Sequence, residues 1–265
     1  MILYDEVITE YLDNKSTEKY SNHWVFNNIE PNEYLFKQPS YEDNEIVKNI
    51  YNEIKVILED FNPLNEEIFN NLFPDYNKIV KESKVLLVVG CPEMYDAMFM
   101  EYDNDDYIVF DLINLSKYLK YGYSINKIVT DLLTHEFVHR CIKEKFPNDN
   151  ERAFTEKLNY ITFDEGFAHL LAYKENIKDH DFSNNFYKEK YEKSKLKLKE
   201  AISEQDKEKQ KSLLQDADVG SYWDKYAAIA GKLYLAQHIN ELDDIYNKGW
   251  KNIINDILNE KEYKL

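Results

Sequence analysis

The sequence predicts an α+β fold that is predominantly helical, with a small mixed or antiparallel sheet next to a long helix. Three observations favour this class. Apolar residues recur at helical spacing over most of the 265 residues. A short β-branched run, Lys84–Val89, ends at Gly90 and indicates a buried strand. Two apolar runs, Ala97–Tyr102 and Tyr107–Ile113, flank a polar loop at 103–106 and indicate an antiparallel hairpin.

The segment 1–83 is expected to be an N-terminal helical region. Apolar residues recur every three or four positions between Tyr41 and Phe61, and acidic residues precede them, as suits a helix N-terminus. A shorter helix is expected from Pro63 toward Phe73. The segment 84–265 is expected to carry the functional site and to form one compact unit with the N-terminal region.

The chain after the hairpin is expected to be helical. The range Ile125–Lys145 has a broad apolar face, and a second helix is expected from Thr162 to about Tyr173. The stretch Phe186–Leu214 is rich in Lys and Glu and has few large apolar residues, which favours an exposed helix or helical hairpin. Two more helices are expected over Trp223–Leu242 and Ile245–Leu258.

The composition excludes several classes of protein. A formal net charge of -17 repels phosphate backbones and anionic lipid, so we expect neither nucleic-acid nor membrane partners. No stretch approaches the ~20 apolar residues that a membrane-spanning helix needs. Cys91 and Cys141 form no CxxC pair, and the N-terminus has no basic segment before an apolar run. We therefore expect a cytoplasmic protein, and its oligomeric state stays open.

The sequence His135-Glu136-Phe137-Val138-His139 has the spacing of a metal site on a helix. Residues four apart lie on one helix face, so both imidazoles can reach one ion at ~2.0–2.1 Å. Glu136, beside the first ligand, is poorly placed to bind the same ion and well placed to take a proton from a metal-bound water. This pattern predicts a zinc centre with Glu136 as general base.

A catalytic zinc ion usually has three protein ligands, so a third is expected elsewhere. The best candidate is Glu165, at the start of a second apolar helix where the small Gly166 and Ala168 permit close helix approach. Asp164 is a rival ligand, which we interpret as a hydrogen-bond acceptor from His135 or His139.

His169 lies one turn beyond Glu165 on the same helix face. Three roles remain open for it: metal ligand, substrate contact or structural histidine.

HEFVH followed by the Glu of Asp164-Glu165-Gly166-Phe167-Ala168 resembles the gluzincins, the zincin metallopeptidases with a Glu as third ligand. This group includes the thermolysin-like proteases and the membrane-alanyl-type aminopeptidases. The layout is most similar to bacterial zinc-dependent proteases with a peptidase-MA-like domain. The resemblance covers roughly Lys84 to Tyr234 and is specific at the two motifs. It implies a zincin-like fold.

The resemblance also implies roles for individual residues. His135, His139 and Glu165 would bind Zn²⁺, and Glu136 would be the general base. An edge strand before the first metal helix would pair with a peptide substrate, and Tyr107–Leu112 is in the expected place.

Relatives place a Tyr or His after the third ligand to stabilise the oxyanion. Tyr222 and Tyr226 are at a suitable distance along the chain, with Tyr226 slightly favoured. The following helix, Ala227–Gly231, is rich in small residues and is expected to pack tightly beneath the site. The Gly-x-Met-Glu-Asn motif of the aminopeptidases is absent, and Met98–Tyr102 is only a faint echo of it. Its absence speaks against recognition of a substrate's N-terminal amine and hence against aminopeptidase activity, and the choice between endo- and exopeptidase stays open.

The sequence thus predicts a zinc metallopeptidase that hydrolyses a peptide bond with a metal-activated water and takes a peptide or protein substrate. Two alternatives stay open. One is a metal-dependent hydrolase of non-peptide substrates. The other is a non-catalytic, zincin-fold binding protein, in which His169 would serve as a fourth protein ligand and leave no position for water.

Overall fold

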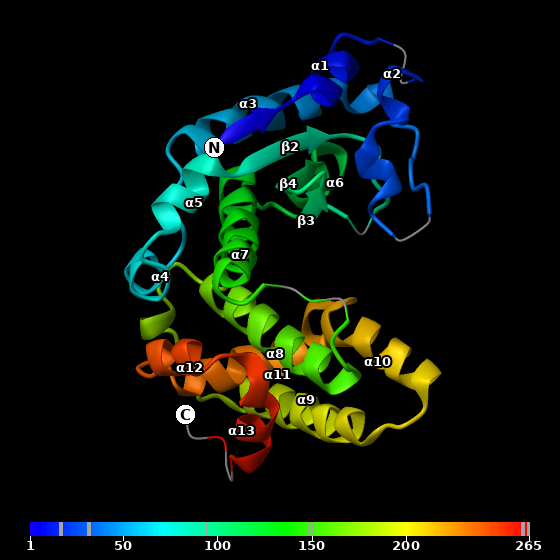
Figure 1. Cartoon of the computed structure of the whole chain (residues 1–265). Helices are drawn as coiled ribbons and strands as arrows, with labels where there is room; N and C mark the ends of the chain where they lie inside the picture. Colours follow the sequence, from blue (N-terminus) through cyan, green and yellow to red (C-terminus); the bar gives the residue numbers. More distant parts are fainter. Residues whose placement is uncertain are drawn as a thin grey trace. The chain divides into compact units, whose positions relative to one another are not determined.

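The chain folds into two compact units, Met1–Pro63 with Asn77–Glu136 and Leu64–Tyr76 with Phe137–Leu265 (Figure 1). The boundary lies inside one continuous helix, α7 (Ile125–Lys145), whose bounds match those predicted. The computed structural model describes residues 1–15, 18–30, 33–93, 95–147, 149, 151–260 and 263.

No helix within the described part of the chain combines the length and the apolar character needed to cross a membrane.

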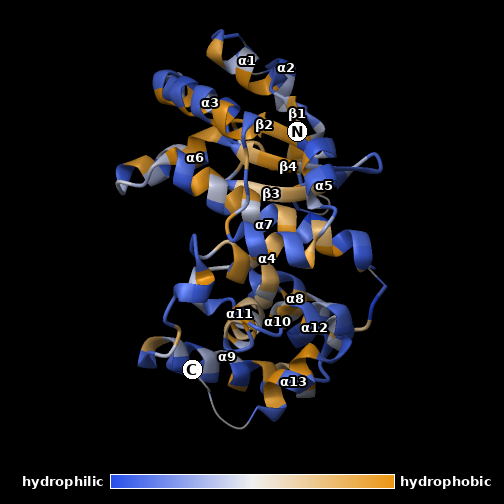
Figure 2. Ribbon diagram, turned by 90° about the vertical axis from the view of Figure 1, so that its left-hand side faces the viewer, coloured by the Kyte–Doolittle hydropathy of each residue, from blue (hydrophilic) through white to orange (hydrophobic). Residues whose placement is uncertain are grey.

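The first unit contains a mixed sheet of four strands in the order β1-β2-β4-β3, as the predicted small sheet requires. Strand β2 pairs in parallel with β1 and β4, and β4 pairs antiparallel with β3. The hydrophobic colouring of β2 and β4 in Figure 2 reflects their buried side chains, among them Val85, Leu87 and Val109. The strands are β1 (Ile2–Tyr4), β2 (Lys84–Val88), β3 (Ala97–Tyr102) and β4 (Asp105–Asp111).

The predicted hairpin is confirmed, with a shorter turn than the polar loop indicated. Tyr102 pairs with Asp105, so only Asp103 and Asn104 lie between the strands. Both have positive φ, 53° and 64°, which is the requirement of a type I′ turn. Asp and Asn tolerate this backbone conformation better than other non-glycine residues, and it fits the twist of the two strands.

The expected position of the edge strand is wrong. Strand β4, which carries Tyr107–Asp111, lies between β2 and β3 and makes backbone hydrogen bonds on both sides. It therefore has no free edge on which a peptide could pair, and β3 is the edge strand beside it. Leu112 belongs to helix α6 (Leu112–Lys120), because the Asp111 side chain accepts a hydrogen bond from the Asn114 N–H and caps that helix.

The N-terminal region is not wholly helical, because β1 pairs with β2 and so joins the central sheet. The predicted helix at 41–61 is present as α3 (Asn44–Glu59), after a 3₁₀ turn, Tyr41–Asp43. Its apolar stripe is buried, including Ile50 and Ile54. The remaining N-terminal helices are α1 (Glu6–Leu12), α2 (Glu18–Ser21), the 3₁₀ turn Trp24–Asn27, α4 (Glu66–Leu72) and α5 (Tyr76–Glu82).

The second unit is built on two crossing helices, α8 (Phe154–Leu171) and α11 (Tyr226–Gln237). Helix α8 begins at Phe154 instead of near Thr162, because the Glu156 side chain accepts the Ala153 N–H and closes its first turn. The helices touch backbone to backbone, since a Cβ on Gly231 would lie 2.0 Å from the Thr162 carbonyl oxygen. This confirms tight packing of the small-residue helix.

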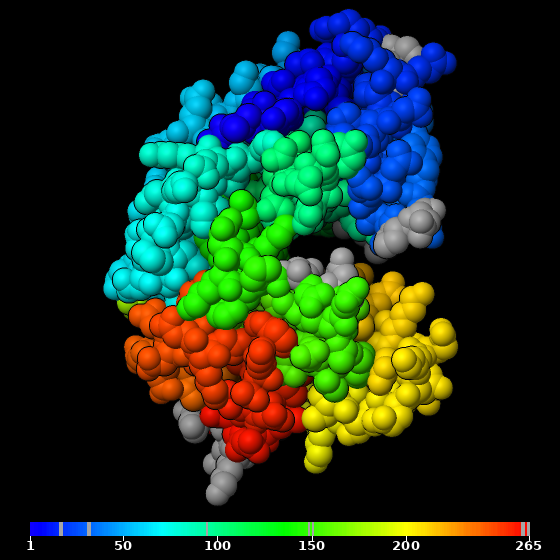
Figure 3. All heavy atoms as spheres, viewed as in Figure 1, coloured from blue at the N-terminus to red at the C-terminus, as the bar shows by residue number. Residues whose placement is uncertain are grey.

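The other C-terminal helices surround this pair. The Lys- and Glu-rich stretch forms two helices, α9 (Asn185–Ser203) and α10 (Lys207–Asp218), and Figure 3 shows this yellow segment on the visible surface. The predicted last helix is divided at Gly249, whose positive φ of 79° is incompatible with a right-handed helix and ends α12. The remaining elements are α12 (Leu242–Lys248), α13 (Ile253–Asn259) and the 3₁₀ turns Ile177–Asp179, Tyr222–Asp224 and Trp250–Asn252.

Candidate metal centre

Helix α7 carries the HEFVH sequence, with His135 and His139 one turn apart on the same face. The helix is held by apolar side chains on its other faces, since Phe137 and Val138 are fully buried. Glu136 is also buried, with 6% of its surface exposed. A buried carboxylate has restricted side-chain motion, and a general base must be fixed in position to accept a proton.

His139 lies between two acidic side chains of α8. Its Nδ1 is 3.0 Å from Asp164 Oδ2, and its Nε2 is 3.5 Å from Glu165 Oε1. A histidine that binds a metal through one nitrogen commonly gives its other N–H to a carboxylate, which fixes the ring and its tautomer. The Asp164 contact is the one interpreted from the sequence, with His139 as the histidine it orients.

Glu165 also faces His169, one turn further along α8, with 3.4 Å between Oε2 and Nε2. Burial raises the pKa of Glu165 to about 7, and the nearby His139 opposes this rise. Burial also holds the pKa of His169 well below its usual range, and the cations Lys225 and Lys232 lower it further. A neutral imidazole with an available lone pair is the form that binds a metal ion.

Three side chains offer ligand atoms close enough together to hold one ion. Atoms of His135, Glu165 and His169 all lie within 4.8 Å of one another. Two of the predicted ligands, His135 and Glu165, belong to this group. Its third member is His169, whereas the sequence predicted His139. His139 approaches the same carboxylate through its Nε2. Within the second unit, His139 of α7 therefore lies close to Glu165 of α8, which in turn lies close to His169.

The donor set fits a zinc ion. Imidazole nitrogens and a carboxylate are its ordinary ligands in catalytic sites, alongside an open position. In addition, the buried Oδ1 of Asp164 has no hydrogen-bond partner within the described part of the chain. An acidic group that points away from water is suited to a place beside a cation.

Further charged groups near the centre come from segments that carried no motif. Burial raises the pKa of Asp218 to about 6, and the charges of Lys225 and His139 oppose that rise. Asp218 ends α10, and Lys225 precedes α11. No sequence motif marks either residue, because only the packing of α10 and α11 around α8 brings them near Glu165.

The two tyrosines expected near the oxyanion lie in different settings. Tyr226 is buried at the start of α11, and its hydroxyl donates to the Leu213 carbonyl at 2.8 Å. Tyr222 lies in the preceding 3₁₀ turn, with its ring edge-on to the His169 ring and the centroids 5.0 Å apart. The hydroxyl of Tyr226 is thus used by the backbone, whereas Tyr222 adjoins the metal centre.

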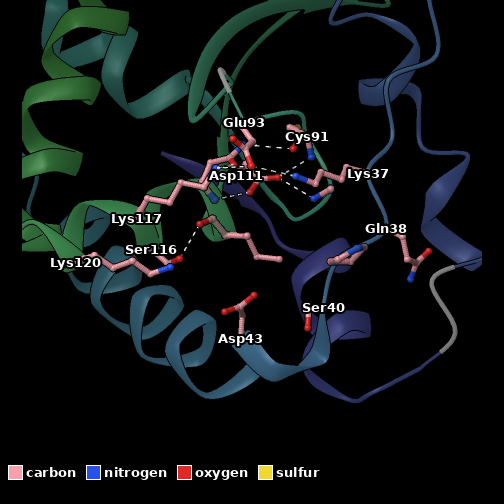
Figure 4. Close-up of a pocket in the computed structure, with 14 residues that line it drawn as sticks. Lys37, Gln38, Ser40, Asp43, Cys91, Glu93, Asp111, Ser116, Lys117 and Lys120 are labelled. Atoms are coloured by element: carbon pink, nitrogen blue, oxygen red, sulfur yellow. Dashed lines mark hydrogen bonds and ion pairs between the residues drawn. The ribbon is translucent and has the colours of Figure 1, made fainter.

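A separate pocket of about 250 Å³ lies in the first unit, around the N-terminus of α6 (Figure 4). Its floor includes Asp111, whose Oδ2 accepts the N–H groups of Gly90 and Cys91, both at 2.8 Å. At its rim, Lys37 and Glu93 form an ion pair at 3.1 Å. The Asp111 carboxylate is engaged by backbone donors, and Lys37 and Glu93 are engaged by each other, so these groups do not converge on a ligand.

No family model matches the chain, and no curated protein or solved structure matches it either.

Proposed function

We propose that this protein is a zinc-dependent peptidase with its metal on α7 and α8. The observation that carries the proposal is the position of His139 between Asp164 and Glu165, at 3.0 and 3.5 Å. A histidine with one nitrogen against an orienting carboxylate and the other beside a second potential ligand is the arrangement of a metal-binding imidazole. The HEFVH spacing supplies His135 one turn away.

In this proposal His135, His139 and Glu165 hold the ion. Zinc, when bound, lowers the pKa of a coordinated water and polarises the scissile carbonyl. Glu136 accepts the proton from the attacking water and then delivers it to the leaving amine. Its burial keeps competing water away from this proton and strengthens its interaction with nearby charge.

Tyr222 is the better candidate to donate a hydrogen bond to the oxyanion. Its ring contacts His169, whereas the Tyr226 hydroxyl already donates to the backbone. An O–H donor placed at the developing negative charge stabilises the transition state more than the substrate. Asp164 would act by orienting His139, and its own contact with the substrate is not needed.

The decisive test compares Glu136→Gln with Glu144→Gln, a matched change on the same helix at an exposed residue paired with Arg140. Zinc content would be measured in both, and hydrolysis would be followed with a pool of internally quenched peptides and a parallel pool of esters. We expect Glu136→Gln to retain zinc and to lose activity by at least about a hundred-fold, because it lacks a base.

The control should retain both properties. Full hydrolysis by Glu136→Gln would refute its role as base, and turnover of the esters alone would make the protein a hydrolase of non-peptide substrates.

One contact favours a second candidate function, a non-catalytic zinc site with four protein ligands. His169 Nε2 lies 3.4 Å from Glu165 Oε2, and His169 belongs to the close group with His135. If His169 completes the coordination sphere, no position remains for water. His169→Ala should then lose zinc as severely as Glu165→Ala does. Under the peptidase proposal, His169→Ala retains most of its zinc affinity.

A further inference from the structure

Three aromatic rings lie side by side at the surface of the second unit. Phe186, at the start of α9, has 46% of its surface exposed, and Tyr222, in the 3₁₀ turn before α11, has 36%. Trp223 lies between them and is half-buried, with its ring centroid 4.9 Å from that of Phe186 and 5.0 Å from that of Tyr222. We call these three rings the aromatic shelf. Apolar surface that stays in water at one place often marks a binding site.

Other side chains form the buried face of α9. Tyr187 and Tyr191 of the same helix are buried, and a residue next to a buried one in sequence points to a different side of a helix. Phe186 therefore stands outside the face that packs α9 on the protein. A phenylalanine that remains half in water forgoes part of the stabilisation that full burial gives. Its exposed ring surface is available to a ligand.

A buried lysine holds the shelf from beneath. Lys232, on α11, has 0% of its surface exposed, and its amine donates a hydrogen bond to the Tyr222 hydroxyl at 2.8 Å. Its Nζ also lies 5.0 Å from the ring centroid of Trp223 and 3.0 Å from that of Tyr173. These contacts fix two rings of the shelf before a ligand arrives, so little side-chain freedom is lost on binding.

The shelf adjoins the candidate metal centre. The ring of Tyr222 lies edge-on to that of His169 with 5.0 Å between centroids, and His169 Nε2 lies 3.4 Å from Glu165 Oε2. One residue of extended chain spans ~3.3–3.6 Å. A peptide whose carbonyl reached the ion would therefore have the shelf within reach of a side chain one or two residues away.

A lysine borders the outer end of the shelf. Lys190, one turn after Phe186, has its Nζ 5.6 Å from the Phe186 ring centroid and 6.0 Å from that of Trp223. Within the part of the chain that the structure describes, no carboxylate forms an ion pair with Lys190, whereas Lys193 of the same helix pairs with Asp224 at 3.1 Å. A lysine that keeps its charge in a chain of net charge -17 offers a place to a carboxylate of the ligand.

We propose that the aromatic shelf and Lys190 form a substrate subsite for an aromatic side chain accompanied by a carboxylate. This inference rests on the proposed peptidase function and names its substrate class, peptides with Phe, Tyr or Trp near the scissile bond and a carboxylate beside it. The rings of the shelf contact the aromatic side chain, and Lys190 pairs with the carboxylate. That carboxylate belongs to the C-terminus of the peptide or to an Asp or Glu side chain.

Binding is measured on zinc-loaded protein labelled with 5-fluorotryptophan. The chain has three Trp residues, and the ¹⁹F signal of Trp223 is identified by its loss in Trp223→Phe. N-acetyl-phenylalanine should shift this signal and leave those of Trp24 and Trp250 unchanged. N-acetyl-alanine, which has no ring, and N-acetyl-phenylalaninamide, which has no carboxylate, should each bind about fivefold more weakly. A Trp223 signal that does not move, or equal affinity for the three compounds, would overturn the inference.

A fourth compound distinguishes the two sources of the carboxylate. N-acetyl-Phe-Glu-amide carries its only carboxylate on a side chain. If it binds as tightly as N-acetyl-phenylalanine, an acidic side chain is sufficient, and the subsite suits cleavage within a chain. If it binds as weakly as N-acetyl-phenylalaninamide, the subsite requires a free C-terminus and indicates a carboxypeptidase. Both results uphold a carboxylate-binding subsite.

Two variants locate the subsite. Phe186→Ala and Lys190→Gln should each weaken binding of N-acetyl-phenylalanine about fivefold, and Lys190→Gln should also abolish the preference for the acid over its amide. Tyr121→Ala, at a tyrosine with 79% of its surface exposed in the first unit, and Lys199→Gln, at an exposed lysine of α9, are the matched controls. Both should bind as the wild type does. A preference for the acid that survives in Lys190→Gln would contradict the role of this lysine.

Hydrolysis separates failure of this inference from failure of the peptidase proposal. Wild-type protein should cleave peptides that carry the aromatic residue and the carboxylate with a kcat/KM about tenfold above that for alanine analogues, and Phe186→Ala should remove most of this difference. Cleavage without the preference would overturn the subsite and leave the peptidase proposal intact. Binding that shifts the Trp223 signal, with no cleavage of any peptide, would instead overturn the peptidase proposal.

Discussion

Asp111 in the first unit and Glu165 in the second are both carboxylates removed from water. Burial raises the pKa of Asp111 to about 6 and that of Glu165 to about 7. The groups around them differ. Asp111 accepts backbone N–H groups of Gly90, Cys91 and Asn114 at 2.8 to 2.9 Å. Glu165 instead faces the imidazoles of His139 and His169 at 3.5 and 3.4 Å.

The comparison separates a structural carboxylate from a candidate ligand. Backbone N–H donors occupy three of the roughly four lone-pair sites of the Asp111 carboxylate and tie the segment after β2 to the start of α6, so little capacity is left for a cation. The partners of Glu165 are side chains that bind metals themselves. A raised pKa therefore does not mark a functional site without the identity of the groups that surround it.

The largest expected effect concerns zinc affinity. Glu165→Ala should weaken zinc binding by more than about a hundred-fold, because the loss of an outer partner of a ligand already costs 10- to 100-fold. Asp111→Ala should leave the affinity unchanged. Competition with a chromophoric chelator measures both. Equal affinity in wild type and Glu165→Ala would remove Glu165 from the ligand set. Weakened binding in Asp111→Ala would contradict the distinction between Asp111 as a structural carboxylate and Glu165 as a ligand.

A smaller effect is expected on stability. In Asp111→Asn one carboxylate oxygen becomes an NH₂ group that meets backbone N–H donors, so the unfolding free energy should fall by about 1–3 kcal/mol. Zinc affinity should stay constant. Urea unfolding at pH 7.5 measures the change, with Asp103→Asn in the exposed hairpin turn as control. A cost no larger than that of the control would show that the three backbone bonds do not stabilise the fold.

The elements that the sequence predicted well have local causes. The hairpin depends on Asp103 and Asn104, and α7 depends on apolar spacing over its own length. The strand order does not have a local cause. Nothing near Tyr107 shows that its strand lies inside the sheet, because β2, which pairs with it, comes from before the hairpin. The start of α8 was missed because capping by Glu156 extends the helix beyond its apolar stretch.

The candidate site divides in the same way. The HEFVH helix and Glu165 follow from short motifs, and their role as ligands stays a prediction. Asp218 lies in α10, whose Lys- and Glu-rich composition suits an exposed helix, and Lys232 lies in α11, whose apolar composition suits a packed helix. Their place near the centre depends on how α10 and α11 pack on α8. The preference for Tyr226 over Tyr222 rested on position along the chain, which does not reveal which hydroxyl is used by the backbone.

The smallest expected effect is the pH dependence of stability in metal-free protein. The folded pKa of Glu165 lies above its usual value of 4.5, so its contribution to stability is complete below that value and is lost as the pH rises through about 7. For Asp111 the corresponding loss occurs between 3.8 and about 6. Between pH 6.5 and 7.5, therefore, Glu165 is still titrating and Asp111 is already ionised.

Wild-type protein without metal should lose about 0.7 kcal/mol of unfolding free energy across this interval, since one titrating group changes stability by at most ~1.4 kcal/mol per pH unit and Glu165 is about half protonated here. Glu165→Gln should remove that slope, because its amide does not titrate, and Asp111→Asn should retain it. Urea midpoints at closely spaced pH values measure the three slopes. If Asp111→Asn flattened the curve and Glu165→Gln did not, the carboxylate that remains protonated near neutral pH would be the structural one. The contrast between the two buried acids would then be reversed.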